Sequence, residues 1–200
     1  MNYPFLKAAC VGLLLGAGAC NSKPDSVTQA QDANEQKIEN NTPNTTAGEK
    51  LEDARKYDTD FMTKAASGGM LEVQLGQQVA QKAMSPQAKM IGERMVKDHT
   101  KANDELKAMA AKMNVTLPTT LGKDQQNVYN EVLAEKGAKL DKEYVDKMES
   151  DHKDDIKQYE EASTKAASPE LRAFATKTLP TLREHLAMIE KAKPAVDALK

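Results

Sequence analysis

The chain contains three histidines, and each falls where a helical pattern calls for a buried residue. His99 lies on a stripe of small and apolar residues spaced by three and four. His152 and His185 occupy equivalent positions on two later stripes, and Glu72 interrupts an earlier one. Imidazole nitrogens with one carboxylate suit a divalent transition metal such as iron, copper or zinc, and suit calcium or magnesium poorly. The pattern therefore indicates a buried metal site, provided that these residues converge.

Four long helical segments must position these side chains, and turn signals separate the segments. Ser85-Pro86 and Ser168-Pro169 each pair an N-cap residue with a proline at the first helical position. The links before them are very short, so each closes an antiparallel hairpin. Helices are expected at residues 58–83, 86–113, 121–136, 140–166 and 169–196. The sequence therefore predicts an all-α fold, an antiparallel four-helix bundle with an extra short helix between the second and third long helices.

The four residues also match in height along such a bundle. Glu72 precedes the first hairpin turn by nearly as many residues as His99 follows it, and His152 and His185 flank the second turn in the same way. At about 1.5 Å of rise per residue, the members of each pair lie level to within about 3 Å. We therefore expect one metal site at mid-bundle, formed by Glu72, His99, His152 and His185. The alternative is that each histidine is an ordinary core residue satisfied by a hydrogen bond.

Acidic and sulfur-containing side chains flank the histidines. An acid directly precedes each one, and Glu149 lies one turn before His152. Because adjacent helical residues point in different directions, these acids are expected either to hold a histidine of a neighbouring helix or to stay solvated. A methionine one turn from a histidine is either core filling or a soft ligand for copper(I). The candidate supporting or alternative ligands are Asp98, Glu149, Asp151, Glu184, Met95 and Met148.

The N-terminal residues 1–19 are typical of a secretory signal. They combine Lys7, an apolar run too short to span a bilayer, and small residues directly before Cys20. This arrangement resembles the bacterial lipoprotein processing site, which implies cleavage before Cys20 and a lipid on its sulfur. The expected location is then the bacterial cell envelope, anchored in a membrane and facing the periplasm or the outer membrane. An ordinary signal peptide with an incidental cysteine is the alternative.

Residues 20–56 are expected to form the lipid attachment and a disordered tether. Their composition is mostly polar and charged, with few apolar residues, so they offer little surface to bury. A flexible coil of this length reaches roughly 35 Å, enough to hold a domain away from a membrane. The bundle domain is accordingly predicted over residues 57–196.

The charge balance excludes some partners. The net charge is −2, and lysines and glutamates are interleaved rather than clustered, which argues against nucleic acid as a partner. Of the two cysteines, Cys10 would leave with the signal, so the mature chain would have no internal disulfide. Core packing, helped by a metal if one binds, must then stabilise the domain.

Four motifs resemble the bacterial family called domain of unknown function 4142. These motifs are Glu72-Val-Gln-Leu-Gly76, Met95-Val-Lys-Asp-His99, Met148-Glu-Ser-Asp-His152 and Leu179-Pro-Thr-Leu-Arg-Glu-His185. The resemblance implies a secreted or lipid-anchored protein with a ferritin-like four-helix bundle and an unsettled activity. Di-iron proteins of that fold carry Glu-x-x-His on two helices, but Val96 and Leu182 stand three residues before His99 and His185. A single-ion site therefore fits better than a di-iron oxidase.

Three functional hypotheses follow from these observations. The first is an envelope lipoprotein that binds a transition metal ion, for metal binding or stress protection. The second is a non-enzymatic structural or interaction lipoprotein with a metal-free polar core, and the third is an iron or copper oxidoreductase. No nucleophile with its base, no phosphate-binding glycine loop and no cofactor fingerprint is visible in the sequence. The sequence therefore favours a protein without enzymatic activity.

Overall fold

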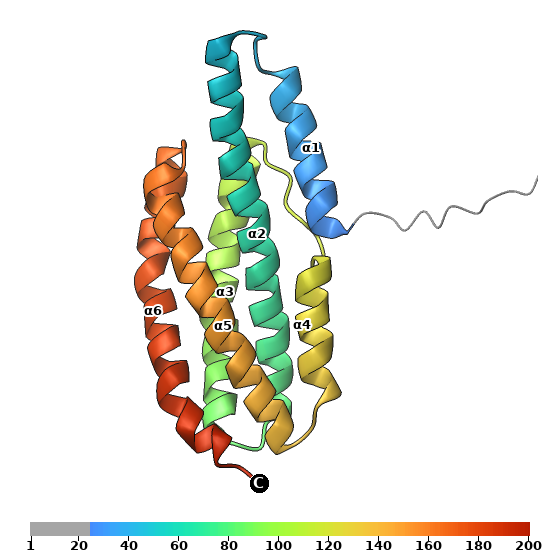
Figure 1. Ribbon diagram of the computed structural model, residues 1–200, viewed down its shortest axis with the longest axis vertical. Coiled ribbons are helices and arrows are strands. Elements are labelled where there is room, and N and C mark those ends of the chain that lie inside the picture. The colour runs from blue at the N-terminus through green and yellow to red at the C-terminus, as the bar shows by residue number, and fades with distance from the viewer. Residues whose placement is uncertain (1–24) are drawn as a thin grey trace, which may run out of the picture.

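The structure is a computed structural model that describes residues 25–200. Every regular element in this range is a helix, which confirms the predicted all-α class, and the helices assemble into a bundle (Figure 1). The helices are α1 (Ser26–Asn40), α2 (Thr46–Lys82), α3 (Pro86–Met113), α4 (Lys123–Ala134), α5 (Ala138–Lys165) and α6 (Pro169–Asp197). The predicted signal at 1–19 and Cys20 lie outside the described residues.

Two helical hairpins, α2 with α3 and α5 with α6, make up most of the bundle. The second helix of each hairpin begins where its Ser-Pro signal predicts, α3 at Pro86 and α6 at Pro169. The Ser85 hydroxyl accepts a hydrogen bond from the amide of Ala88, and the Ser168 hydroxyl accepts one from Leu171. Helix α3 ends at Met113, as predicted, because Asn114 takes a left-handed conformation at its C-terminus.

Each hairpin turn is held by a buried carboxylate of the other hairpin. Asp141 on α5 accepts hydrogen bonds from the amides of Met84 and Ser85, at 3.1 and 2.6 Å. Asp58 on α2 accepts bonds from the amides of Ala167 and Ser168, both at 2.8 Å. These amides belong to the turns and the helix starts, where no backbone carbonyl is in reach to accept from them. The two hairpins therefore complete each other's ends.

Close packing of α2 against α3 depends on two glycines. A Cβ at Gly76 would lie 2.8 Å from the carbonyl oxygen of Gly92, and one at Gly92 would lie 2.7 Å from the carbonyl oxygen of Gly76. Backbone therefore meets backbone at this crossing, one turn beyond Glu72. By contrast, a Cβ at Gly68 would meet nothing within 4 Å.

The N-terminal region differs from the sequence prediction. Within the range predicted as a disordered tether, α1 is helical, and α2 begins at Thr46 instead of near Asp58. Ala30, Asn34 and Ile38 form the buried face of α1. The Asn34 side chain donates to the carbonyl of Thr116 and accepts from its amide, at 2.9 and 2.7 Å. A polar residue thus ties α1 to the link after α3, and composition alone does not reveal this contact.

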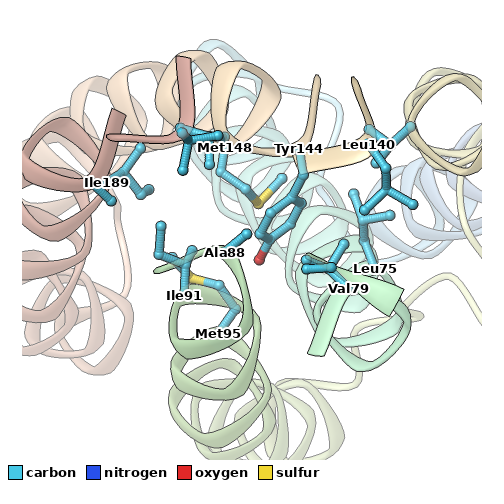
Figure 2. Close-up of a cluster of buried hydrophobic side chains, with 14 of the residues drawn as sticks. Leu75, Val79, Ala88, Ile91, Met95, Leu140, Tyr144, Met148 and Ile189 are labelled. Atoms are coloured by element: carbon cyan, nitrogen blue, oxygen red, sulfur yellow. The ribbon is translucent and has the colours of Figure 1, made fainter. Parts of the chain in front are cut away.

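The apolar core divides into two clusters with a polar layer between them. Figure 2 shows the cluster at the α2–α3 turn, where Tyr144 lies among Leu75, Val79, Met95 and Met148. The second cluster lies toward the α5–α6 turn and includes Phe61, Tyr159 and Phe174. None of the helices in residues 25–200 combines the length and apolar character that a bilayer crossing requires.

Candidate metal site

The structure brings the four predicted residues together in the polar layer. Glu72 comes from α2, His99 from α3, His152 from α5 and His185 from α6. Their exposed fractions are 0% for Glu72 and His152, 1% for His185 and 6% for His99. The three imidazole centroids form a triangle with sides of 5.2, 5.3 and 5.6 Å. Four helices thus supply one side chain each to a single buried cluster.

Hydrogen bonds outside the cluster assign the protons of two imidazoles. Nε2 of His185 lies 3.0 Å from Oδ2 of Asp98, and Nδ1 of His152 lies 3.1 Å from the carbonyl oxygen of Met148. A carboxylate and a carbonyl only accept, so Nε2 of His185 and Nδ1 of His152 are the donors. In the neutral rings, the other nitrogens carry lone pairs.

Those two lone-pair nitrogens face each other. Nε2 of His152 lies 3.2 Å from Nδ1 of His185. Two acceptors at hydrogen-bond distance repel unless a proton or a cation lies between them. Two nitrogens bound to one tetrahedral ion at about 2.0–2.1 Å would stand about 3.3 Å apart. The observed separation therefore matches that of two ligands of one ion.

Glu72 and His99 add further buried atoms without partners. Oε2 of Glu72 lies 2.6 Å from Nδ1 of His99, and Oε1 lies 3.5 Å from Nε2 of His152. Neither contact has hydrogen-bond geometry, so both carboxylate oxygens stay unpartnered. Nε2 of His99 is also buried without a hydrogen-bond partner. Buried polar atoms without partners are costly in a metal-free core. They are also the atoms that a metal ion would use.

Burial sets the protonation of the cluster. Desolvation lowers the pKa of His99 and of His185 to about 4, and in His185 the hydrogen bond to Asp98 opposes this effect. The pKa of His152 also falls well below its ordinary value, through desolvation and then the charges of the other histidines. Desolvation raises the pKa of Glu72 well above its ordinary range. At neutral pH the imidazoles are therefore neutral, the form that binds metals.

Two further acids adjoin the cluster on α5. Asp151 approaches Glu72 and His152, and one ligand atom from each of these three residues lies within 4.8 Å of the others. Asp151 is partly exposed as a whole residue, but its Oδ2 is buried and unpartnered. Desolvation, and next the charge of Glu72, raise the pKa of Asp151 to about 8. Desolvation and the charge of Asp151 also raise the pKa of Asp155.

Asp155 is the residue that sequence reasoning did not single out. It follows Asp151 by one helical turn, so the two share a face of α5. That spacing is the signal that could have found it. The run Asp151, Asp154 and Asp155 otherwise looks like a solvated surface.

The predicted supporting or alternative ligands divide between the edge of the site, the protein surface and the apolar core. Asp98 contacts His185 and also pairs with Arg94. Glu149 pairs with Lys153, and Glu184 lies 3.4 Å from Nη2 of Arg94 on the exposed surface. Met95 and Met148 are buried within the apolar cluster of Figure 2, where they fill the core. Of the acids that precede the histidines, Asp98 and Asp151 therefore adjoin the site.

The fold and the site define an all-helical bundle with buried histidines and carboxylates that could hold a metal ion. The chain belongs to the family described as "Domain of unknown function (DUF4142)", whose sequence pattern matches residues 40–192. Comparisons with curated proteins and with solved structures found no match. The predicted family is thus confirmed.

Proposed function

We propose that this protein is a bacterial envelope lipoprotein whose bundle binds one transition metal ion through Glu72, His99, His152 and His185. Its role is metal binding or protection against metal stress rather than catalysis. The ion is iron, copper or zinc, because three imidazoles and one carboxylate suit these metals.

One observation carries the proposal: the 3.2 Å approach of Nε2 of His152 to Nδ1 of His185. Both nitrogens are acceptors in the neutral rings, because the ring protons are directed at Met148 and Asp98. A proton between them is unfavourable at neutral pH, since burial lowers the pKa of both imidazoles. A cation removes the repulsion and also satisfies Glu72 and Nε2 of His99.

The broader setting belongs to the same proposal. Two antiparallel hairpins of long helices, each contributing two residues to the site, support a ferritin-like four-helix arrangement. The small residues before Cys20 support a lipid anchor, with a membrane as the partner and the cell envelope as the location.

The test is the metal content of the purified full chain after production with iron, copper and zinc supplied. We expect about one ion per chain, and a chelator should lower the melting temperature by about 5–10 °C, as follows from an ion present at about 100 times its Kd. In His152→Ala, the bound metal and the effect of the chelator should both be lost.

Glu149→Gln is the matched control, because Glu149 lies on the same helix but pairs with Lys153 at the surface. This variant should keep the metal. A wild-type chain that carries no stoichiometric metal and melts at the same temperature with and without chelator would overturn the proposal. That result would favour the metal-free polar core.

A further inference from the structure

A polar pocket of about 610 Å³ lies beside the candidate site. Helices α1, α2, α4 and α5 supply its lining, which includes Gln31, Ser67, Gly68, Gln125, Asp151 and Asp155. Asp151 is also one of the residues next to Glu72 and His152. Asp151 therefore belongs both to the pocket lining and to the buried cluster.

The donors of a cation site lie where Asp151 of the pocket lining meets Glu72. Both oxygens of Glu72 and Oδ2 of Asp151 are buried without hydrogen-bond partners. Lys64 and Lys123 line the same pocket, but within residues 25–200 neither forms an ion pair with Asp151 or Asp155. Two adjacent buried carboxylates without a counter-ion require a proton or a cation.

This outer set overlaps the inner set of three histidines. Glu72, Asp151 and His152 form one group of ligand atoms within 4.8 Å, and His99, His152 and His185 form the other. Nδ1 of His152 donates to Met148, so only Nε2 can bind an ion in either group. One nitrogen cannot serve two ions at once. An ion must therefore occupy one position or the other.

We propose that Glu72, Asp151 and His152 form an outer loading position for a divalent cation, which reaches the three histidines from the polar pocket by exchanging Asp151 for His99 and His185. The proposal rests on metal binding by the inner residues. The carboxylates nearer the pocket attract a hydrated cation and replace part of its water. The neutral imidazoles then bind it with a preference for transition metals over calcium or magnesium. Glu72 and His152 stay bound during the transfer.

The test compares the rates and the equilibrium of Co²⁺ binding to the full chain, followed by visible absorption. A residue used only in transit changes the association and dissociation rates equally and leaves Kd unchanged. For Asp151→Asn we therefore expect both rates to fall about tenfold or more while Kd stays within about threefold. Asp154→Asn is the matched control, because Asp154 lies on the same helix but is exposed and pairs with Lys157.

A second pair of variants tests the route without touching a ligand. Gly68 lines the pocket and has free space beside it, so Gly68→Leu should narrow the passage and slow both rates, whereas Gly68→Ala should not. Equal rates in Asp151→Asn and Asp154→Asn would overturn the inference. A faster dissociation alone would also overturn it, because Asp151 would then be a ligand of the final site. A wild-type chain that binds neither Co²⁺ nor iron, copper or zinc would instead overturn the proposed function.

Discussion

Oδ2 of Asp98 on α3 accepts a hydrogen bond of 3.0 Å from Nε2 of His185 on α6. Burial opposes the negative charge of Asp98, but His185 and Arg94 outweigh this effect, and the pKa of Asp98 is lowered. An ionised Asp98 holds the proton of His185 on Nε2 and leaves Nδ1 free toward His152. Asp98 is therefore a positioning residue for the proposed ion.

Asp98→Asn should weaken metal binding by about 10–100-fold, because an amide no longer fixes the tautomer of His185 through charge. Competition titration with a coloured chelator measures this change. Glu184→Gln is the control, since Glu184 also contacts Arg94 but lies at the surface. An unchanged Kd in Asp98→Asn would show that the hydrogen bond to His185 has no role in metal binding.

The stability of the metal-free protein should decrease between about pH 7 and about pH 8. Asp151 has a pKa of about 8 in the folded chain against an ordinary value of 3.8, so the folded state holds more protons than the unfolded state across that interval. Stability is then lost as pH rises toward 8, by about 1 kcal/mol. The histidines offset less than half of this loss, because the unfolded imidazoles titrate at about pH 6.5 and have mostly lost their protons by about pH 7.

Urea unfolding with a chelator at several pH values measures this loss. Asp151→Asn should remove much of it, because the amide does not titrate. With the metal bound, the carboxylates are needed in the ionised form, so the stabilisation by metal should increase with pH. A metal-free stability that rises from about pH 7 to about pH 8 would contradict the assignment.

Substitution by alanine should change the stability in opposite directions at Gly68 and Gly76, two glycines of α2. Gly68→Ala should stabilise the protein by about 0.5–1 kcal/mol, because the position is helical and has free space. Gly76→Ala should destabilise it by about 1–3 kcal/mol, since the new Cβ would collide with the backbone of Gly92. Thermal melting of both variants compares them directly. The explanation fails if both substitutions shift the melting temperature in the same direction.

Asp141→Ala should be strongly destabilising. It leaves the amides of Met84 and Ser85 without an acceptor at the α2–α3 turn, where the contact of Ser85 is buried, at a cost of about 2–4 kcal/mol. Asp146→Ala on the same helix removes an exposed ion pair with Lys193 and should cost less than about 1 kcal/mol. Denaturant titration of the two variants gives the comparison. Similar losses in both would mean that the turn does not depend on Asp141.

Much of the geometry of the site follows from helical spacing. The Ser-Pro signals fixed where α3 and α6 begin, and short turns fixed the heights of Glu72, His99, His152 and His185. The structure gathers these four because the rise of a helix is constant. Asp155 was not foreseen, since α5 also turns a second face inward, toward the pocket, and an acid on such a face resembles a surface residue in the sequence.

The prediction of a disordered tether over residues 20–56 was wrong for residues 26–40 and from residue 46 onward. Composition averaged over that range hides Ala30, Asn34 and Ile38, which repeat every four residues on one face. The contact of Asn34 with Thr116 joins residues far apart in the chain, and no local pattern contains it. A periodic pattern within one helix cannot predict a long-range contact between a side chain and the backbone of another segment.

The helix α1 changes how the proposed lipoprotein would meet its membrane. Because α1 begins at Ser26, few residues separate Cys20 from the bundle, and at most about 3.6 Å per residue the lipid would stand within about 20 Å of Asp25. Asp25 lines the polar pocket. The pocket would then open close to the headgroups instead of roughly 35 Å away on a flexible coil. Anionic headgroups concentrate cations at a bilayer surface, so the bundle would sample that enriched layer.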